Sequence, residues 1–563
     1  MTDGSTKGKY MASLSIVPLG GMGKVTQNMY LYHYDQEILI VDCGIGFPDI
    51  QQPGADILIP DTQYLHKLLE QGNRIVGMIL THGHDDHIAA TPYILPEFKE
   101  EFPIFGSPLT VGFAENRLSD GGVQRTLEVI EDHKWYKAGE HFTFSSHAVT
   151  HSVPDTKHFF IKTPQGMVYH GTDFKIDRDP VDGIKVDEAR ITEVAKEGVM
   201  FMTMDCLRVE QKTWVPSESA TGPVIREQME NVAGKVIVTL MSSHIHRIQQ
   251  TVEAAAELGR KVVFVGRSVE QNVEVALRLK LLDIPRSMLV DKRDIDDYRD
   301  NELCIIIAGS QGQEGSSLVR AVYGEHRSVQ ITKRDVVIFA AGAIPGNEIP
   351  YYQAIDELCR NNVHVVYPAI VDDLHESGHG SAEEQQYLLK LVNPDYVMPI
   401  GGADRHRVKF LDFVADEIGF PRSNVVIPKH GEVITIENGE PRVSDTITIM
   451  SRIVDGLGIG DVGPRVLSER KALGGAGMIV VVIPQHKGQL VLDAIRVVSR
   501  GFVFMKEAQE VMTFIESETR SVIEMHKDLK NDELIKKIEK KLVKKIASAI
   551  RREPLIIAEI VEI

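Results

Sequence analysis

The chain has 563 residues, of which 43% are hydrophobic and 25% charged, and its 62 Lys and Arg against 80 Asp and Glu give a net charge of −18. This mix excludes wholesale disorder, and the acidic balance argues against a coat that binds nucleic acid by bulk charge, although it leaves room for an enzyme with a locally positive channel. Residues 1–12 lack the apolar segment of a signal peptide, no apolar run reaches the ~20 residues of a membrane span, and the four cysteines show no CxxC spacing. We therefore expect a cytoplasmic protein of about three to four domains, without a membrane segment or a disulfide framework.

The first two hundred residues are expected to alternate short strands with turns rich in Gly, Asp and His. Residues 13–21, 28–34 and 37–44 have the β-branched and aromatic content of strands. Residues 61–72 have helical spacing and end in Gly, and residues 74–80 form an apolar strand that runs into a His-rich turn.

Between about 220 and 370 the pattern changes to alternating helices and continuous apolar strands, which is typical of a parallel sheet covered on both faces. The segments are 252–259 before 261–266, then 302–310, 334–342, and 356–362 before 363–370. This region is predicted to be an α/β insert. Short strands return at 395–400, 424–428 and 432–436, as if the first domain resumes.

These patterns predict an α/β protein with four segments. A first domain covers residues 1–215, an insert 216–372, the resumed first domain 373–450, and a linker with a small α+β domain 451–563. The last segment holds an apolar run at 477–484 and two helical stretches.

Residues 527–553 contain ten Lys or Arg and five Asp or Glu, with Leu534, Ile538, Leu542 and Ile546 at helical spacing. The pattern fits a packing helix with a solvated basic face, and contact with RNA phosphates is the alternative. The apolar stripe and the 477–484 run offer more apolar surface than a small domain easily buries, so this segment is expected to assemble subunits into a homodimer or homotetramer.

A metal site is predicted in the turn after residues 74–80, which reads Thr81-His82-Gly83-His84-Asp85-Asp86-His87. Imidazoles and carboxylates so close together at the end of a buried strand need partners, and neutral imidazole and carboxylate are ligands that suit zinc. On a turn, His82 and His84 can face one ion while Asp86 and His87 face another.

Three further residues at predicted strand ends complete this constellation. His151 in VTHSVPD would be the third ligand of the first ion, and Asp173 in HGTDFKID could bridge both ions. Asp42 in LIVDCG is expected to orient the histidine turn rather than to bind an ion. The pair His244 and His246 is interpreted as structural or RNA-facing, because no acidic residue or third His is near it in the sequence.

The order Asp42, HxHxDH, His151, Asp173 resembles the metallo-β-lactamase superfamily, whose fold is an αββα sandwich with two metals at one edge. Asp205 in TMDCLRVE and the later HESGHGS segment resemble the β-CASP nuclease branch of that superfamily. From about residue 13 to the C-terminus the chain is similar to the ribonuclease J family, in segments such as LTHGHDDHIAATPYIL, GTDFKIDRDPVDG, AGSQGQEG and HESGHGS.

The resemblance implies a zinc-dependent ribonuclease of RNA maturation and decay, including rRNA processing, that degrades single-stranded RNA from the 5′ end and also cuts internally. Mn²⁺ or Mg²⁺ could replace Zn²⁺. His379 would protonate the leaving group or hold the scissile phosphate, with Asp205 and Asp42 as further residues of the catalytic site. Substrate phosphate, preferably a 5′-monophosphate, would lie on His375, Glu376, Ser377, Gly378 and His379, a donor-rich segment able to hold an anion.

One departure from the family pattern concerns the second metal. Family members usually carry a His after the strand that ends in Pro, but here Met398-Pro399-Ile400 is followed by Gly401. His406 could replace it only if the loop moved. Gly401 keeps open the alternative of a catalytically weakened paralogue that acts as an RNA-binding or structural subunit. A small-molecule hydrolase of the same superfamily is a further alternative, but it would leave the insert and the SGH motif without a purpose.

Overall fold

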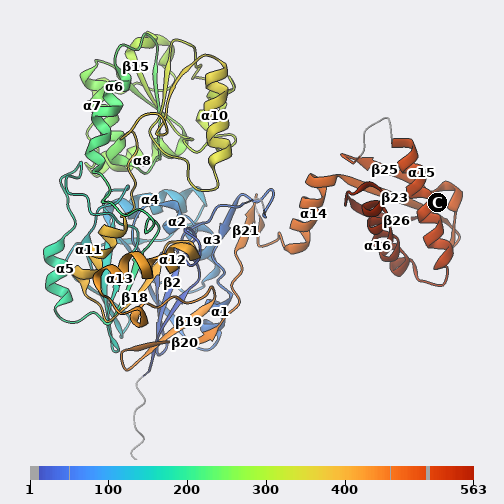
Figure 1. The fold of residues 1–563 in the computed structure, drawn as a ribbon, viewed down its shortest axis with the longest axis horizontal. Coiled ribbons are helices and arrows are strands. Elements are labelled where there is room, and N and C mark those ends of the chain that lie inside the picture. Colours follow the sequence, from blue (N-terminus) through green and yellow to red (C-terminus); the bar gives the residue numbers. More distant parts are fainter. Residues whose placement is uncertain (1–11, 50, 457, 503–507) are drawn as a thin grey trace, which may run out of the picture. The chain divides into compact units, whose positions relative to one another are not determined.

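The computed structural model describes residues 12–49, 51–456, 458–502 and 508–563 (Figure 1). Residues 1–11, on which the expectation of no signal peptide rests, lie outside the described residues. The chain divides into two compact units, which are described separately: residues 1–46 with 58–452, and residues 47–57 with 453–563. No helix in the described part is long and apolar enough to cross a membrane.

The first unit contains two sheets that enclose one core. The eight-stranded sheet combines antiparallel pairing at β20 to β3 with parallel pairing at β3 to β7. Its strands in spatial order are β20 (Glu440–Thr446), β19 (Glu432–Glu437), β1 (Leu14–Pro18), β2 (Tyr30–Tyr34), β3 (Glu37–Val41), β5 (Arg74–Leu80), β6 (Ile104–Gly106) and β7 (Leu127–Val129).

The second sheet has six strands and separates two apolar layers. The alternation of side chains along a strand explains both layers, because Phe159 and Ile161 face the core between the sheets while Phe160 faces the helices behind. Helices α5 (Glu188–Ala195), α11 (Ala382–Val392) and α12 (Asp404–Phe410) supply that outer layer. The strands are β18 (Tyr396–Ile400), β12 (Phe201–Asp205), β11 (Gly166–His170), β10 (Lys157–Thr163), β9 (Phe142–Ala148) and β8 (Trp135–Ala138).

The remaining helices of this part are short or lie near the first sheet. They are α1 (Gln63–Glu70), α2 (Asp85–Ile88), α3 (Thr91–Ile94), α4 (Pro108–Asp120) and α13 (Asp416–Ile418), with a short strand β4 (Ile57–Ile59). The layered metallo-β-lactamase sandwich expected from the sequence is confirmed.

The insert is a wholly parallel five-stranded sheet with helices on both faces, as the alternating pattern predicted (Figure 1). Its strands in spatial order are β14 (Lys261–Val265), β15 (Leu303–Ile307), β13 (Val236–Thr239), β16 (Val336–Phe339) and β17 (His364–Val366). Its helices are α6 (Thr221–Met229), α7 (Ile245–Glu257), α8 (Arg267–Arg278), α9 (Ser317–Val322) and α10 (Glu348–Arg360).

After the insert the chain rejoins both sheets, since β18 pairs in parallel with β12 and β19 pairs with β1. One predicted strand is wrong. Residues 424–428 form no strand, and their only β pairing with β18 among the described residues is an isolated bridge between Val397 and Val425. Pro428 ends this stretch and Pro421 precedes it by three residues, and proline has no amide hydrogen to continue a ladder. The exact limits of the four segments remain predictions.

The second unit is a small α+β domain. Strand β23 (Met478–His486) lies between β25 (Arg496–Arg500) and β26 (Leu555–Glu562) and also pairs with β24 (Gln489–Leu490). Helices α15 (Ala508–Met525) and α16 (Asn531–Ile550) cover one face of the sheet, and α14 (Pro464–Ala476) precedes it. The connecting strands β21 (Arg452–Asp455) and β22 (Gly458–Ile459) pair with each other.

This domain corrects one argument from the sequence. Leu534, Ile538, Leu542 and Ile546 are at most 3% exposed, and they pack on Ile479, Val481 and Ile483 of the same chain. The apolar stripe of α16 therefore needs no partner subunit to bury it, because the sheet already does so.

Candidate metal centre

Asp42 holds the histidine turn in place from the neighbouring strand. It follows β3 in a left-handed conformation (φ 63°) that Asp tolerates better than most residues, and its side chain is fully buried. Its carboxylate accepts hydrogen bonds from the amide and the hydroxyl of Thr81, both at 2.8 Å, and from Nδ1 of His87 at 2.7 Å. Asp42 belongs to none of the metal-ligand clusters of the described residues, and its contacts fix the orientation of His87 instead.

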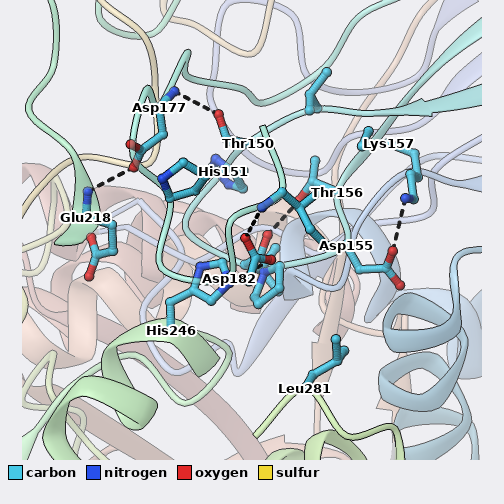
Figure 2. Close-up of a pocket in the computed structure, with 16 residues that line it drawn as sticks. Thr150, His151, Asp155, Thr156, Lys157, Asp177, Asp182, Glu218, His246 and Leu281 are labelled. Carbon is cyan, nitrogen blue, oxygen red and sulfur yellow. Dashed lines mark hydrogen bonds and ion pairs between the residues drawn. The ribbon is translucent and has the colours of Figure 1, made fainter. Parts of the chain in front are cut away.

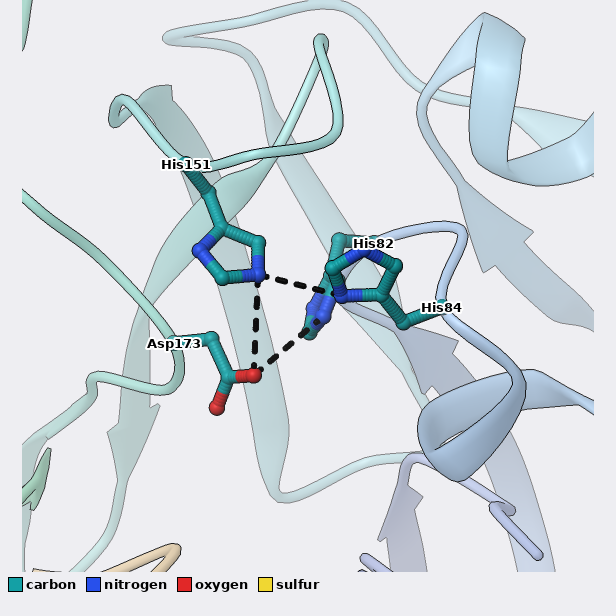
Figure 3. Close-up of side chains that lie close together, drawn as sticks. All are labelled: His82, His84, His151 and Asp173. Carbon is teal, nitrogen blue, oxygen red and sulfur yellow. Dashed lines mark hydrogen bonds and ion pairs between the residues drawn. The ribbon is translucent and has the colours of Figure 1, made fainter. Parts of the chain in front are cut away.

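The first cluster joins His82, His84, His151 and Asp173 from three different loops (Figure 3). Nε2 of His151 lies 3.1 Å from Nδ1 of His84 and 3.7 Å from Oδ2 of Asp173, and Nε2 of His82 lies 3.6 Å from the same oxygen. The four ligand atoms lie within 4.8 Å of one another. Three ring nitrogens and one carboxylate oxygen are donors that suit zinc.

Two further clusters share Asp173. In one of them Nε2 of His87 lies 3.5 Å from Asp173 and 3.8 Å from Asp86. In the other, His379 and Asp205 join Asp173, and Nε2 of His379 lies 3.9 Å from its carboxylate. The structure thus brings together all six residues that the sequence proposed as ligands, with Asp173 at their centre.

The side chains of the first cluster fit a bound cation. Nε2 of His82 is fully buried and has no hydrogen-bond partner within the described parts of the chain, which is costly unless something else binds it. Burial lowers the pKa of His84 to about 3 and the pKa values of His82 and His151 well below the usual range, so these rings are neutral, which is the form of histidine that binds a metal.

The second cluster is less favourable for a cation, because a proton competes for the same nitrogen. Burial opposes the charged form of His87, but the nearby carboxylates of Asp173, Asp42 and Asp86 more than offset it and raise its pKa. Burial raises the pKa of Asp86 to about 6. A divalent ion would have to displace protons here, and its binding should depend on pH.

The segment 375–379, which follows the insert in the chain, is hydrogen-bonded to residues of the metal centre. The ring of His151 donates from Nδ1 to the carbonyl of Gly378 at 2.6 Å, and a side chain at position 378 would clash with Ser152 and His151. Ser377 accepts a hydrogen bond from the amide of His379 at 3.0 Å. The segment therefore orients a predicted ligand, whatever else it binds.

His379 and Asp205 form a close pair. Nδ1 of His379 donates to Oδ2 of Asp205 at 2.7 Å. Burial disfavours the charged ring, but the carboxylates of Asp205 and Asp173 outweigh it and raise the pKa of His379 to about 9. A protonated imidazole at neutral pH can donate a proton to a leaving oxygen.

The other two residues of the segment contact Arg247, which the sequence reasoning missed. Arg247 is 1% exposed, binds Glu218 through two of its nitrogens at 2.6 and 2.8 Å, and donates to Nδ1 of His375 at 2.7 Å. It also donates to the carbonyl of Glu376 at 3.4 Å, while burial raises the pKa of the Glu376 carboxyl to about 7. Its sequence neighbours His244 and His246 were the only signal that could have drawn attention to it.

Asn28 was also missed. Its Nδ2 lies 3.0 Å from Nε2 of His87, the nitrogen that faces Asp86 and Asp173. A single Asn at the start of a strand carries no recognisable pattern, so nothing in the sequence pointed to it.

Gly401 lies beside the clusters, at the position where the family pattern has a histidine. A Cβ at this position would lie 3.5 Å from Oδ1 of Asp205 and 3.8 Å from Oδ1 of Asp173, and the backbone φ is +67°. His406 does not take its place. Its Nδ1 accepts from the amide of Ala403 and its Nε2 lies 3.5 Å from Glu210.

The pair His244 and His246 has acidic neighbours that are distant in the sequence. Nε2 of His244 lies 3.4 Å from Glu218, and Nε2 of His246 lies 3.1 Å from Asp182. The fold therefore brings carboxylates to both histidines, although none is near them in the sequence, and neither histidine joins a metal-ligand cluster among the described residues. His246 and His151 also line a cavity of about 50 Å³ (Figure 2). That volume holds one or two waters, at roughly 30 Å³ each, and is too small for a nucleotide.

Comparison with known proteins identifies the domains of the chain. Residues 22–158 match the metallo-beta-lactamase superfamily, residues 233–358 the family described as "Ribonuclease J, beta-CASP domain", and residues 465–563 the "Ribonuclease J C-terminal domain". A solved structure of a protein of unknown function from Enterococcus faecalis covers 75% of this chain and is itself covered completely, with a TM-score of 0.52 and 15% identity, which supports the fold alone.

Relatives of known name extend over most of the chain. "Ribonuclease J 1" of Streptococcus pyogenes is 32% identical over 501 residues, covering 89% of this chain and 88% of the relative. "Ribonuclease J" of Thermus thermophilus is 33% identical, covering 87% and 85%, and "Ribonuclease J2" of Bacillus subtilis is 30% identical, covering 99% and 100%. With these matches and its β-CASP and C-terminal domains, the chain belongs to the ribonuclease J family of the metallo-β-lactamase superfamily.

Proposed function

We propose that this protein is a zinc-dependent ribonuclease that hydrolyses the phosphodiester bonds of single-stranded RNA, from the 5′ end and also internally, in RNA maturation and decay in the cytoplasm. The observation that carries the proposal is the sharing of Asp173 by three clusters. His82, His84 and His151 converge with it on one side, Asp86 and His87 on another, and His379 with Asp205 on a third.

Zn²⁺ is the ion that best suits three neutral imidazoles and a carboxylate, with Mn²⁺ or Mg²⁺ as alternatives at the oxygen-rich second cluster. Bound in the two clusters, such ions would supply activation of water for attack on phosphorus and offset the negative charge of the phosphate oxygens. Asp173 would be a ligand in both clusters. Asp42 would keep His87 turned towards the second cluster through the bond to Nδ1.

His379 would act as the proton donor to the departing 3′-oxygen. Its raised pKa supplies the proton at neutral pH, and Asp205 keeps the ring in position through Nδ1 so that Nε2 faces Asp173. Residues 375–379 would bind substrate phosphate, with a preference for a 5′-monophosphate.

A catalytically weakened paralogue remains the second candidate, and Gly401 is the specific observation that favours it. The family position for a ligand of the second metal has no donor atom here, although its Cβ direction points at Asp205 and Asp173. In that case the protein would bind RNA or support an active subunit.

The test is single-turnover cleavage of end-labelled 5′-monophosphate RNA by the purified protein with added Zn²⁺ or Mn²⁺. Cleavage products that shorten from the 5′ end are expected, together with internal cuts. The His82→Ala, His84→Ala double variant should lose cleavage and bound metal, and His66→Ala, a histidine outside the clusters, should lose neither. If the wild-type protein binds RNA but cleaves none at any metal concentration, the paralogue interpretation is correct.

A further inference from the structure

His158 is a fully buried histidine that belongs to none of the metal-ligand clusters of the described residues. It lies on β10 directly opposite His147 on β9 and packs its ring against Phe174 and Tyr169. All four side chains are fully buried, on the face of the second sheet that is opposite the core shared with the first sheet. A polar ring at such a position needs hydrogen-bond partners, and the partners of His158 lead to the metal centre.

The hydrogen bonds of His158 have a fixed direction. Its Nε2 accepts from the backbone amide of Thr172 at 3.1 Å, and an amide can only donate. The proton of the neutral ring is therefore on Nδ1, which donates to the hydroxyl of Tyr169 at 2.9 Å. That hydroxyl is left free to donate to Nε2 of His147 at 3.1 Å.

Thr172 directly precedes Asp173, the carboxylate that all three clusters share. One oxygen of Asp173 lies between 3.5 and 3.9 Å from the rings of His82, His87, His151 and His379. A shift of a few tenths of an ångström in the Thr172–Asp173 backbone would change the distances in every cluster at once. The only side chain among the described residues that hydrogen-bonds the amide of Thr172 is His158.

We propose that His158 is a positioning residue of the metal centre, which holds the shared carboxylate of Asp173 through the amide of Thr172. The relay through Tyr169 and His147 fixes the ring tautomer that accepts this bond. The proposal rests on the metal centre proposed above, but it concerns metal affinity and can be tested without RNA.

Two substitutions of His158 separate positioning from packing. His158→Gln can place its amide oxygen where Nε2 lies and keep the bond from Thr172. His158→Asn is shorter, reaches only the position of Nδ1 and loses that bond. Tyr32→Phe is the matched control, because it removes another fully buried bond between a tyrosine and a histidine, Tyr32 to His170 at 2.7 Å, which does not involve the Thr172 amide.

The measurement is competitive chelator titration of Zn²⁺ and the absorption spectrum of the Co²⁺-substituted full-length protein, alongside the melting temperature of each variant. We expect His158→Asn to weaken metal binding about 10-fold, in the range seen for partners that orient metal ligands, and to change the Co²⁺ spectrum. His158→Gln should stay within about 3-fold of wild type on the same scale, and Tyr32→Phe should leave affinity and spectrum unchanged. All three should lower the melting temperature.

The proposal is overturned if His158→Asn binds metal as wild type does, or if the Gln and Asn variants lose the same affinity. Should His158→Asn fail to fold, Tyr169→Phe provides the second test. It removes the acceptor that keeps the proton on Nδ1, so it should weaken metal binding by a smaller factor, and unchanged affinity would contradict the relay. A shift in metal affinity in a protein that cleaves no RNA would leave this proposal standing and remove the proposed function.

Discussion

Nδ1 of His379 donates to Oδ2 of Asp205 at 2.7 Å, although the two residues are 174 positions apart in the chain. Asp205 ends β12, and His379 follows the insert and the loop that returns the chain to the first domain. The pair therefore forms only when the segment after the insert packs against the end of this strand. It places a raised-pKa imidazole within 3.9 Å of Asp173.

Asp205→Asn should change the pH dependence of cleavage. The carboxylates of Asp205 and Asp173 raise the pKa of His379 to about 9, so the proton-donating form persists up to that pH and is lost above it. Without Asp205 the proton is lost at a lower pH, and the alkaline limb of the kcat profile should move down by about one unit or more. Asp132→Asn, which removes a partner of Lys157 outside the clusters, should leave the limb in place. An unchanged limb in Asp205→Asn would show that His379 is not the proton donor.

Gly401→His should strengthen binding of the second metal. Wild-type protein is expected to hold close to one tightly bound ion per chain and to need excess divalent ion for activity, because the second cluster lacks one donor. The new side chain would point towards Asp205 and Asp173, but at φ +67° it costs about 1–2 kcal/mol of stability. Gly401→Ala carries the same strain without a donor and serves as the control. The readout is the metal concentration for half-maximal cleavage, and two tight ions in wild type would refute the prediction.

Ser377→Ala should reduce discrimination between RNA 5′ ends. The Ser377 hydroxyl accepts from the amide of His379, so its loss loosens the segment proposed to bind a 5′-monophosphate. We expect wild type to degrade 5′-monophosphate RNA faster than 5′-triphosphate RNA, and the variant to narrow that ratio. Ser316→Ala, which removes the helix cap of α9, should lower stability without changing the ratio. Equal rates for both substrates in wild type would mean that the segment does not select the 5′ end.

Assembly through the C-terminal domain should depend on the outer face of its sheet rather than on α16. On that face Val498 of β25 and Ile557 of β26 lie in register with Val480 and are 45% and 39% exposed. If homodimers or homotetramers form here, Val498→Glu with Ile557→Glu should give monomers by light scattering. Val443→Glu, at an equally exposed strand position of the first unit, should not change the mass. A protein that stays oligomeric after the double substitution assembles through another surface.

The exposed lysines of α16 should separate the two interpretations of its basic sequence. Lys536, Lys537, Lys540 and Lys544 have no ion pair among the described residues, nor does the half-buried Lys541, and their neighbour Lys545 pairs with Glu518. Like charges three or four residues apart destabilise a helix, so an anionic partner that neutralises these lysines would stabilise α16. If RNA phosphates bind here, Lys537→Gln, Lys540→Gln and Lys544→Gln together should reduce the slope of log K against log salt by about 2, at ~0.7 per phosphate. The same change at Lys67, Lys99 and Lys333 should not, and an unaltered slope would leave a solvated face.

Local patterns were sufficient to predict the parallel insert and to propose the histidine turn, whereas the metallo-β-lactamase sandwich was expected from the family resemblance. The apolar strand 74–80 became β5 with the same limits, and the alternation between 220 and 370 became the parallel insert. Histidines clustered within one turn must lie close together whatever the remote fold does, so His82, His84 and His87 could be proposed from spacing. Residues 424–428 show the limit of this reasoning. Their β-branched composition suits a strand, but Pro421 and Pro428 lack the amide hydrogen that a ladder of hydrogen bonds to β18 needs.

The tertiary structure alone decided which distant residues meet. Ser377, Gly378 and His379 contact the metal centre because β18 pairs with β12 after the insert, and no local pattern encodes that pairing. The same holds for Arg247 with Glu218, for Asn28 with His87, and for the hydrogen bond from Thr172 to His158. The sequence by itself determined that the side chains of the turn 81–87 could bind a metal, because that depends on residue type and on spacing along one turn. Their distances and the protonation of His379 depend on burial and on charges brought from remote segments, which only the folded chain supplies.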